Sequence, residues 1–431
     1  SEAAYFIESN GVAAVVDPLR DIDEYNQLAK EKNAVIKYIF ETHFHADFVS
    51  GHLDLSKHTG ATIVYGPQTE TNFPVHVAKD GEIFSIGDIS IQAIHTPGHT
   101  IESTCYLLKD VNQKPHCIFT GDTLFVGDVG RPDLSSGDMT TNELASIMYD
   151  TLNNKILPLP DDLIVYPAHG AGSSCGKNLG TETFTTIGEQ KRSNYALQQQ
   201  SREEFIKAFT SDLKEAPVYF AINAKINKEG YDSLEAIKTK GMHALSISDF
   251  KKKIEEDVTI LDTRIASIFT QGFVPGSMFI GLEGRFAEWA GTLISFEQRI
   301  ILVTEEGMEE ETLVRLARVG FDKMEGYLKG GFEAWKKSGE KIDLIIEVEP
   351  DELAMDIKHD HKSTGVDVRR ETEIGEGHIK NAINLPLSEM TDVAQIATLD
   401  DDQNLYVHCA GGYRSVIASS LIKRQGYQNL R

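Results

Sequence analysis

The chain has 431 residues, enough for about three domains of roughly 150 residues each. Hydrophobic residues make up 41% of it and charged residues 25%, an ordinary composition for a folded protein that excludes a disordered or collagen-like chain. Acidic residues outnumber basic ones by 66 to 42, which gives a formal net charge of −24. Because such a surface repels phosphate backbones and anionic lipids, we expect neither a nucleic-acid nor a membrane partner.

The cysteine content and the N-terminal residues indicate the cellular compartment. Four cysteines in so long a chain do not make a disulfide framework. No apolar run reaches the roughly 18 residues of a membrane-spanning helix, and the first residues lack the basic start and apolar segment of a secretory signal. We therefore expect a cytoplasmic, multidomain enzyme. A homo-oligomer is a separate expectation.

The N-terminal third carries short apolar runs that end in turn signals, a pattern typical of β-strands. The predicted strands are 13–16, 35–40, 61–65, 89–94, 118–119 and 163–165. Helical patterning follows at 22–31, 141–152 and 188–209. The histidines of this part mostly follow a predicted strand, on the connecting loops where sheet enzymes usually hold their chemistry.

Three short motifs in this part contain metal-binding side chains. They are T-H-F-H-A-D-F at 42–48, T-P-G-H-T at 96–100 and T-G-D-T at 120–123, and P-A-H-G follows at 167–170. Imidazoles and carboxylates on separate loops can converge on one cation. An isolated H-x-H is weak evidence, but all these motifs together in this order form a specific signal, so the sequence predicts a metal site.

With these motifs, residues 1–240 resemble the metallo-β-lactamase-fold superfamily, which implies a four-layer αβ/βα sandwich with metal at one edge. Binuclear hydrolases of that superfamily extend the first motif to H-x-H-x-D-H, whereas this chain has Phe48 at the last position. A phenyl ring offers no lone pair to a metal. We therefore expect one metal ion per chain rather than two.

Within the superfamily, the pattern is most similar to that of the persulfide dioxygenases. That resemblance implies one Fe(II) ion per chain, held by His43, His99 and Asp122. Two histidines and one carboxylate suit non-haem Fe(II) and O₂ because they leave coordination positions open. The resemblance also implies that three further side chains orient ligands or water: His45, Asp47 and His169. Hydrogen bonding within the loops explains these three residues equally well.

Two other residues of this part have alternative explanations. In the related dioxygenases, the arginine that matches Arg131 lies at the carboxylate of the thiol substrate. A salt bridge to Asp133 explains Arg131 equally well. Cys175 has no basic partner in the sequence and is interpreted as a packed thiol rather than a nucleophile.

The second half of the chain contains a duplication. V-T-I-L-D-T-R at 258–264 matches S-T-G-V-D-V-R at 363–369, so that Asp262 and Asp367 lie 105 positions apart. Each copy has about a hundred residues, a common domain size. The second copy ends before any counterpart of the segment that closes the first, so we expect its C-terminal end to be incomplete. The predicted domains are 1–240, 241–342 and 343–431.

The last copy contains a cysteine loop, V-H-C-A-G-G-Y-R-S, between a predicted strand and a predicted helix. The loop runs from Cys409 to Arg414 and cradles the sulfur with four intervening residues: Ala410, Gly411, Gly412 and Tyr413. Backbone N–H groups, the helix N-terminus and Arg414 all favour an anionic sulfur. A thiolate in this setting can carry a transferable sulfur as a persulfide.

Two flanking motifs distinguish this loop from that of a tyrosine phosphatase, which would place cysteine and arginine similarly. With D-V-R at 367–369 and G-H-I-x-x-A-x-N-L-P at 377–386, the last copy resembles rhodanese, a sulfurtransferase.

The middle copy has no cysteine in its corresponding loop. Aligned on the strand before the loop, it has Glu305 at the position of Cys409 and Glu310 at that of Arg414. A carboxylate neither holds persulfide sulfur nor stabilises an anion. We therefore expect the middle copy to be inactive.

The complete order resembles bacterial fusions of a persulfide dioxygenase with a degenerate and an active rhodanese domain. It implies that O₂ oxidises a low-molecular-weight thiol persulfide to sulfite and thiol, and that a Cys409 persulfide converts sulfite to thiosulfate, for sulfide detoxification. One alternative is a glyoxalase-II-like thioester hydrolase fused to a sulfurtransferase, which needs a metal-activated water. Another is a non-enzymatic sulfur carrier in which the first domain is a scaffold.

Overall fold

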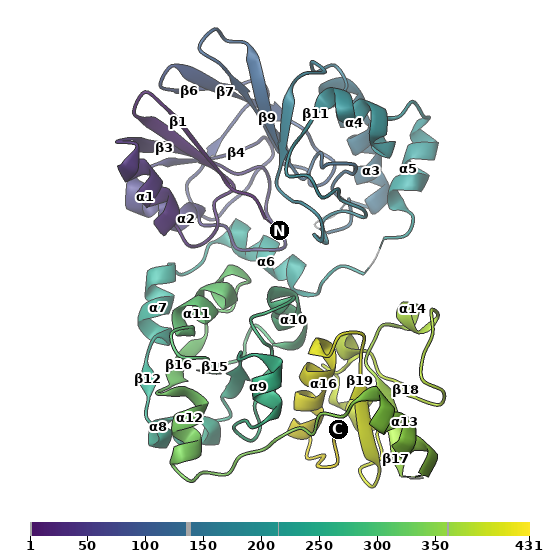
Figure 1. The fold of residues 1–431 in the computed structure, drawn as a ribbon. Coiled ribbons are helices and arrows are strands. Elements are labelled where there is room, and N and C mark those ends of the chain that lie inside the picture. Colours follow the sequence, from purple (N-terminus) through teal and green to yellow (C-terminus); the bar gives the residue numbers. More distant parts are fainter. Residues whose placement is uncertain (1, 135–138, 214, 360–361) are drawn as a thin grey trace. The chain divides into compact units, whose positions relative to one another are not determined.

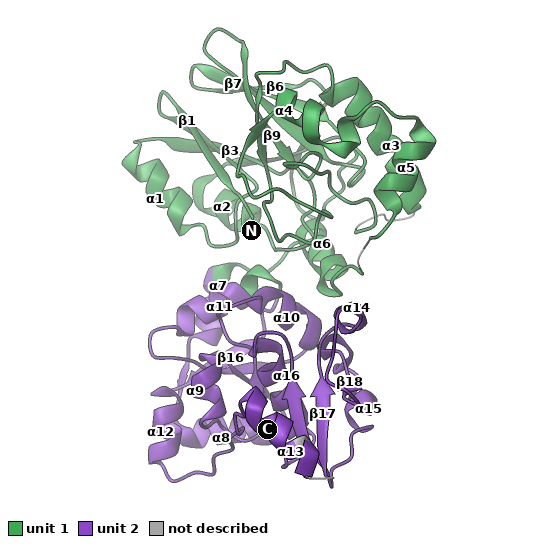
Figure 2. Cartoon of the chain, turned by 45° about the vertical axis from the view of Figure 1, so that its right-hand side comes forward, with its two compact units in different colours: residues 1–234, 317–320 green, residues 235–316, 321–431 purple. Residues whose placement is uncertain are grey.

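The structure is a computed structural model that describes residues 2–134, 139–213, 215–359 and 362–431. It comprises two compact units, residues 1–234 with 317–320 and residues 235–316 with 321–431 (Figure 2). The second unit contains both copies of the duplicated segment. The division into three domains therefore stays a prediction. None of the described helices combines the length and the apolar character needed to cross a bilayer.

The first unit is built on two sheets (Figure 1). The first sheet has five strands, in the order β1 (Tyr5–Ser9), β2 (Val12–Val16), β3 (Val35–Phe40), β4 (Thr62–Tyr65) and β5 (His76–Val77). The second has six, in the order β11 (Thr185–Thr186), β10 (Ile164–Pro167), β9 (Pro115–Gly121), β8 (Thr104–Lys109), β7 (Ile89–His95) and β6 (Ile83–Ile86). From β2 to β5 the neighbouring strands are parallel, whereas β6 to β9 form an antiparallel meander.

Helices cover the outer faces of both sheets. Their bounds are α1 (Asp23–Glu31), α2 (His52–Thr59), α3 (Thr141–Thr151), the π-helical turn η1 (Leu152–Ile156), α4 (Ile187–Ser193), the 3₁₀ turn η2 (Tyr195–Leu197), α5 (Arg202–Thr210) and α6 (Tyr219–Glu229). One core lies between the sheets, a second under α1 and α2, and a third under α3 and α5. The predicted four-layer αβ/βα sandwich is confirmed.

The single helix predicted over 188–209 is wrong. The chain forms α4, η2 and α5 instead. Asn194 ends α4 because its side chain is buried, donates to the Asp128 carbonyl at 3.0 Å and accepts from the Ala196 amide. Ser201 then begins α5 with a capping box. Polar caps interrupt a segment whose composition alone suits a helix.

The second unit contains one sheet from each copy. The middle copy has five strands, in the order β12 (Ala244–Leu245), β16 (Met324–Leu328), β15 (Ile300–Val303), β13 (Thr259–Asp262) and β14 (Met278–Phe279). The last copy has three, in the order β18 (Ile383–Asn384), β17 (Ser363–Asp367) and β19 (Asn404–His408). All their pairings are parallel. Two rhodanese-like α/β copies, as the sequence predicts, follow the sandwich.

Helices flank these sheets. In the middle copy they are α7 (Leu234–Gly241), α8 (Ile247–Glu255), α9 (Ala266–Thr270), α10 (Phe286–Leu293), α11 (Glu309–Arg318) and α12 (Gly331–Lys337). In the last copy they are α13 (Pro350–His359), α14 (Glu371–Ile374), the 3₁₀ turn η3 (Leu387–Glu389), α15 (Val393–Ile396) and α16 (Tyr413–Arg424). Apolar side chains from α8 and α12 pack on one face of the middle sheet.

The strand register corrects the alignment of the two loops. Asp262 pairs with Val303 in the middle copy, and Asp367 pairs with His408 in the last. The residue after each pair is therefore equivalent, which places Thr304, not Glu305, at the position of Cys409.

A second landmark supports the corrected alignment. Gly307 and Gly412 are 105 positions apart and have φ values of 86° and 84°. Glu309, not Glu310, then corresponds to Arg414. The sequence alignment missed this shift because the strands before the loops are both apolar and tolerate a slip of one residue.

The last residues of the chain extend the smaller sheet. Leu405 donates its amide to the Asn429 carbonyl at 2.8 Å, and Arg431 donates to the Leu405 carbonyl at 2.9 Å. Leu405 and Leu430 form an isolated parallel bridge. Residues 429–431 therefore occupy the place at which β16 begins beside β15 in the middle copy.

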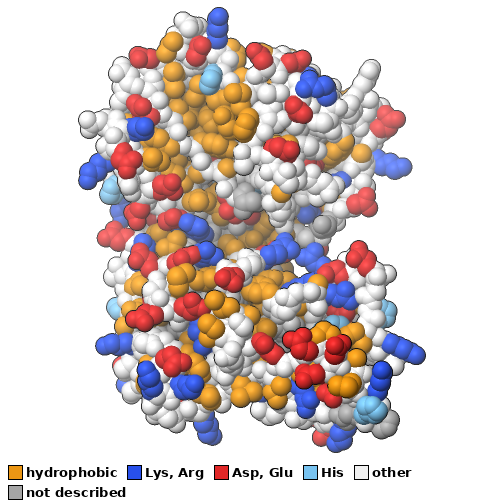
Figure 3. Space-filling model, viewed as in Figure 1, with side chains coloured by type: hydrophobic (Ala, Val, Ile, Leu, Met, Phe, Trp, Pro, Cys, Tyr) orange, Lys and Arg blue, Asp and Glu red, His pale blue; other side chains and the backbone are white. Residues whose placement is uncertain are grey.

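One face of the molecule shows how the charged side chains are distributed. On the face shown in Figure 3, acidic side chains are interspersed with Lys and Arg in each unit. That face presents mixed charge rather than the contiguous basic patch that binds nucleic acid.

Candidate active sites

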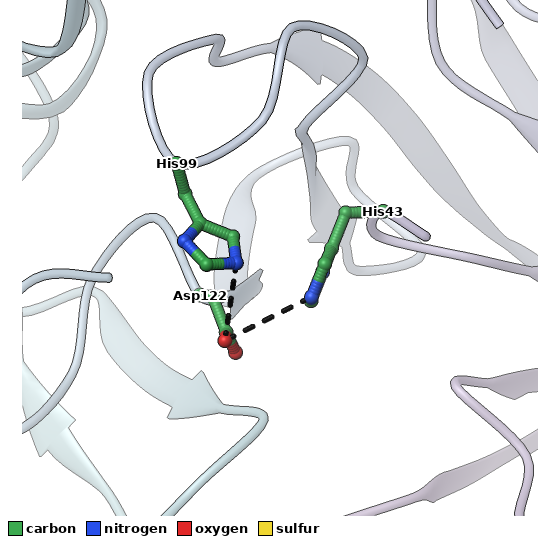
Figure 4. Close-up of side chains that lie close together, drawn as sticks. All are labelled: His43, His99 and Asp122. Atoms are coloured by element: carbon green, nitrogen blue, oxygen red, sulfur yellow. Dashed lines mark ion pairs between the residues drawn. The ribbon is translucent and has the colours of Figure 1, made fainter. Parts of the chain in front are cut away.

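Three side chains on loops after strands form a buried cluster in the first unit. His43 follows β3, His99 follows β7 and Asp122 follows β9. Each is at most 2% exposed, and their ligand atoms lie within 4.8 Å of one another. His43 Nε2 is 3.8 Å and His99 Nε2 3.5 Å from Asp122 Oδ2, and Figure 4 shows both imidazoles directed toward this carboxylate.

Hydrogen bonds set the tautomer of both histidines. His99 Nδ1 lies 2.7 Å from the Arg131 carbonyl, which only accepts, so His99 carries its proton on Nδ1. Thr42 Oγ1 donates to Asp17 Oδ2 at 2.8 Å and therefore accepts from His43 Nδ1 at 2.9 Å.

The consequence is that both Nε2 atoms carry a lone pair. Burial, aided by the neighbouring histidines, also holds the pKa of His43 well below its usual range, which keeps that ring neutral. Neutral imidazoles with a fixed Nδ1–H are the form that binds metals.

The carboxylate supplies an independent indication of a cation. Both oxygens of Asp122 are buried, and neither has a hydrogen-bond partner among the described residues. A buried carboxylate without partners is costly, whereas a metal ion would neutralise it. The residues present therefore fit a bound metal ion.

Gly130 brings a loop into close contact with the cluster. Its amide donates to the Asp122 carbonyl at 2.8 Å. An added Cβ would lie 2.2 Å from that oxygen and 2.9 Å from His99 Nδ1. Only glycine permits this approach, which also brings the Arg131 carbonyl to His99.

His45 points toward a pair of carboxylates. Its Nε2 lies 3.0 Å from Asp17 Oδ1 and 3.5 Å from Glu41 Oε2. Although burial opposes the charged form, Asp17 and Glu41 raise the pKa of His45 to about 10. A protonated imidazole has no lone pair for a metal. The buried ring of Phe48 packs on His45, with 4.4 Å between centroids.

The other two predicted orienting residues lie beside the cluster. His169 Nε2 is 3.3 Å from Asp122 Oδ1 and 3.5 Å from Asp47 Oδ2. His169, Asp47 and His45 form a second group whose ligand atoms lie within 4.8 Å of one another. The structure thus brings together all the residues that the sequence assigned to this centre.

Cys175 also lies at the centre, which the sequence did not indicate. The thiol is buried and its sulfur lies within 4.8 Å of ligand atoms of Asp122 and His169. Burial and the nearby carboxylates raise its pKa well above the usual range, so the sulfur is a neutral thiol. Cys175 therefore has an imidazole neighbour that is adjacent only in the folded chain.

Arg131 forms the salt bridge that the sequence offered as an alternative. Its Nε and Nη2 donate to the two carboxylate oxygens of Asp133, each at 2.7 Å, and its Nη1 contacts the Ser174 carbonyl at 3.4 Å. This pair fixes the loop whose carbonyl orients His99. A role toward substrate stays a prediction.

The cysteine loop of the last copy has one clear donor to sulfur. The Gly412 amide donates to Cys409 Sγ at 3.2 Å, and Cys409 Sγ lies 3.7 Å from Ser415 Oγ. Gly412 has φ 84° and immediately precedes α16. Within the described residues, Ala410 and Gly411 form no hydrogen bond with the sulfur. The helix N-terminus and one amide therefore stabilise an anionic sulfur.

The other two named loop residues contact different partners. Arg414 forms a bidentate pair with Glu373, with N–O distances of 2.7 and 2.8 Å. This pair lowers the pKa of Glu373 to about 2. The Tyr413 hydroxyl donates to the Gly281 carbonyl of the middle copy at 2.7 Å. Arg414 thus acts on the sulfur only through its field, and the Tyr413 side chain does not cradle it.

An ion pair at the start of each rhodanese-like copy reproduces the duplication. Arg369 Nη2 lies 2.7 Å from Asp367 Oδ2 and 2.8 Å from the Gly377 carbonyl. In the middle copy Arg264 makes the same contacts, at 2.7 Å with Asp262 and 2.9 Å with the carbonyl of Gly272.

Several supporting residues could not be identified from sequence. In the sequence, Asp17 resembles an ordinary turn residue after a strand. Its position at a strand end is the one feature that could have indicated a place near the site. Thr42 is part of the first motif and binds the adjacent His43, but its bond to Asp17 forms only in the folded chain. Gly130 and Glu373 have no local signal in the sequence, because each acts on a partner that only folding brings near.

Comparison with known proteins identifies the family. The sequence matches the metallo-beta-lactamase superfamily over residues 1–169 and the rhodanese-like domain over 246–338 and 349–431. A probable hydroxyacylglutathione hydrolase of Schizosaccharomyces pombe is 30% identical over 207 residues, which are 42% of this chain and 76% of that protein.

Two solved structures are similar. A metallo-beta-lactamase from Staphylococcus aureus subsp. aureus COL has 30% identity and a TM-score of 0.67, over 76% of this chain and 95% of that one. ETHE1 from Myxococcus xanthus has 31% identity and a TM-score of 0.46, over 53% of this chain and 93% of that one.

The sandwich with its buried histidine–carboxylate cluster defines a metal-dependent enzyme fold, followed here by rhodanese-like domains. The chain belongs to the metallo-beta-lactamase superfamily and continues into two rhodanese-like domains.

Proposed function

We propose that the chain is a persulfide dioxygenase coupled to a sulfurtransferase. The observation that carries the proposal is that the first motif leaves His45 unable to bind a metal. Phe48 covers His45, and His45 is directed at Asp17 and Glu41. Among the described residues, His43 and His99 then offer unprotonated Nε2 atoms beside the Asp122 carboxylate, a ligand set for one ion.

Such a ligand set suits Fe(II), which would supply O₂ activation when bound. The chain's own residues fix the geometry: Arg131 and Thr42 hold the two imidazoles through their Nδ1 atoms. In the proposed reaction a thiol persulfide, O₂ and water give thiol, sulfite and two protons. The outer sulfur is oxidised and O₂ is reduced.

The second step transfers sulfur between sulfur atoms without net oxidation. A second thiol persulfide first gives its outer sulfur to the Cys409 thiolate and leaves as the thiol. Sulfite then attacks the outer sulfur of the resulting Cys409 persulfide, the S–S bond breaks, and thiosulfate leaves. The electron pair of that bond returns to Cys409 as a thiolate, which the Gly412 amide and the start of α16 stabilise. The substrates are small sulfur compounds in both steps.

A thioester hydrolase is the second candidate, because the relative from Schizosaccharomyces pombe is named a hydroxyacylglutathione hydrolase. A hydrolase with two metal ions would recruit His45, Asp47 and His169, which form the second group beside Asp122. That use requires His45 to lose its proton and leave Asp17.

Metal analysis with two activity assays separates the candidates. We expect one iron per chain, O₂ uptake on addition of a thiol persulfide, and loss of uptake in His43→Ala, His99→Ala and Asp122→Ala. Two zinc ions with hydrolysis of a glutathione thioester and no O₂ uptake would support the hydrolase instead.

Phe48→His is the matched variant, since it restores the missing ligand of the binuclear motif. We expect the metal content of the purified protein to rise from one toward two ions per chain and O₂ uptake to fall. If the wild type already holds two ions per chain and Phe48→His holds the same number, the mononuclear proposal is contradicted.

A further inference from the structure

We propose that the middle rhodanese-like copy positions the sulfur-carrying loop of the last copy, and that the Tyr413 hydroxyl is the contact through which it does so. The proposal rests on the proposed sulfur transfer at Cys409 and assigns a task to a copy that has no cysteine. Both copies lie in the same compact unit.

Tyr413 is the first residue of α16, and its side chain is held by the middle copy. Its hydroxyl donates to the Gly281 carbonyl at 2.7 Å. Its ring lies 6.2 Å from that of Phe279 between centroids, and 3.5 Å from the place where Gly284 would carry a Cβ. Burial raises the pKa of Tyr413, so the hydroxyl remains a donor throughout the neutral range.

Two further bonds fix α16 on the same neighbour. The Phe279 amide donates to Ser420 Oγ at 3.0 Å, and Arg424 Nη1 donates to the Gly276 carbonyl at 3.0 Å. The helix is thus held at its first turn, its middle and its last turn. In all three bonds the partner on the middle copy is a main-chain atom. A copy can therefore lose its catalytic side chains and still perform this role.

The position of Tyr413 connects this anchorage to the sulfur. Gly412 lies immediately before Tyr413, and its amide is the donor to Cys409 Sγ. Within the last copy, the Gly412 carbonyl accepts from Ser415 Oγ at 2.7 Å and from the Val416 amide at 3.2 Å. Arg414 supplies no direct restraint on the sulfur, because both its terminal nitrogens bind Glu373. Of the three bonds to the middle copy, the Tyr413–Gly281 bond is therefore the one nearest in sequence to the amide that faces the sulfur.

Tyr413→Phe tests the proposal in the full chain, because it removes the hydroxyl and keeps the ring packed. We expect kcat for sulfur transfer from thiosulfate to cyanide to fall about two- to tenfold, the value of one hydrogen bond. KM for thiosulfate should stay within about twofold, since the donor's contacts are intact.

The second readout is the pH dependence of Cys409 alkylation by iodoacetamide. Cys105, Cys117 and Cys175 are buried, and Cys409→Ser gives the background. In Tyr413→Phe the midpoint should rise by about 0.3 to 1 pH unit, because a less constrained Gly412 amide stabilises the thiolate less. A role in folding alone would not move this midpoint.

Tyr427→Phe is the control. Tyr427 also donates its hydroxyl to carbonyls, those of Ile396 and Leu399, but within the last copy. It should leave both readouts unchanged. A folded Tyr413→Phe protein with the wild-type alkylation midpoint would overturn the positioning role. If the wild type transfers no sulfur, the proposed function fails while the alkylation comparison still tests the positioning.

Discussion

The two rhodanese-like copies share a framework and differ in the loop that the framework presents. Both place an aspartate–arginine pair at the end of the first central strand and a left-handed glycine before the loop helix. At the equivalent loop position one copy has Thr304 and the other has Cys409. The framework is therefore present in both copies, because neither the aspartate–arginine pair nor the glycine conformation depends on which residue occupies the loop position.

The two copies also differ in the charge of the residues around the loop. The middle loop carries Glu305, Glu306 and Glu309, and the Glu305 side chain accepts from the Ile265 amide at 3.3 Å. At the positions equivalent to these glutamates the last copy has two small neutral residues and Arg414. Negative charge disfavours a thiolate, so the middle loop is unsuited to sulfur chemistry in two independent ways.

The largest difference between the copies should appear when the two equivalent residues are changed. Cys409→Ser should abolish sulfur transfer, since a hydroxyl cannot carry a persulfide, while Thr304→Ala should leave transfer at the wild-type rate. Thiosulfate-to-cyanide turnover measures both. Product analysis of the proposed dioxygenase reaction should then show sulfite in place of thiosulfate for Cys409→Ser only. Loss of transfer in a folded Thr304→Ala protein would show that the middle copy takes part in the chemistry.

The arginine of each framework should matter for stability, but unequally. Arg264 is 5% exposed and its removal leaves the fully buried Asp262 carboxylate without its partner. Arg264→Ala should therefore cost about 3–5 kcal/mol of unfolding free energy. The Arg369 side chain is 18% exposed, so water can replace part of its interaction in Arg369→Ala. Urea unfolding measures both variants, and equal losses would contradict the ordering by burial.

A cysteine inserted in the middle loop shows whether the nearby charges or the shared framework set the stability of a thiolate there. Thr304→Cys, made in a Cys409→Ser background, should give a thiol whose alkylation midpoint lies about one pH unit or more above that of Cys409 in the wild type, because three glutamates surround it. The same iodoacetamide titration measures it. Neutralising the neighbours with Glu305→Gln and Glu306→Gln should lower that midpoint. Coincident midpoints in the two loops would mean that the framework alone sets thiolate stability.

The smallest effect concerns the Arg414–Glu373 pair of the last copy. The pKa of Glu373 is about 2, against an ordinary 4.5. Glu373 therefore stabilises the fold above pH 4.5 and loses that contribution as the pH falls toward 2. Because the pair is partly exposed, we expect about 1 kcal/mol or less. The stability advantage of wild type over Glu373→Gln should be full at pH 6 and shrink on acidification. An advantage that grows in acid would contradict the sign.

The sequence predicted most of the framework and the residues of the histidine–aspartate cluster. Short apolar runs before His43, His99 and Asp122 indicate strands, and the loops after β3, β7 and β9 bring these three residues together. The loop alignment from sequence is off by one because β15 and the centre of β19, residues 405–407, are apolar and lack a residue that fixes the match. Hydrophobic pattern cannot fix register in such strands, whereas the pairing of Asp262 with Val303 does.

The sequence does not identify the partner of Arg414, and it leaves two alternatives for Arg131. Arg414 was expected near the sulfur, but Glu373, far along the chain, binds it. Arg131 had two explanations, and only the folded loop shows its pairing with Asp133. Long-range ion pairs leave no periodic signal, because a single charged residue fits many surroundings.

Gly130 has a consequence for how this protein can vary. The metal ligands beside it are oriented by main-chain atoms, an amide at Asp122 and the neighbouring carbonyl at His99. Side chains along that loop can therefore vary during evolution without moving these main-chain atoms, as long as the Arg131–Asp133 pair keeps the loop in place. Gly130 does not have this freedom, because one added methyl group would separate the loop from both Asp122 and His99.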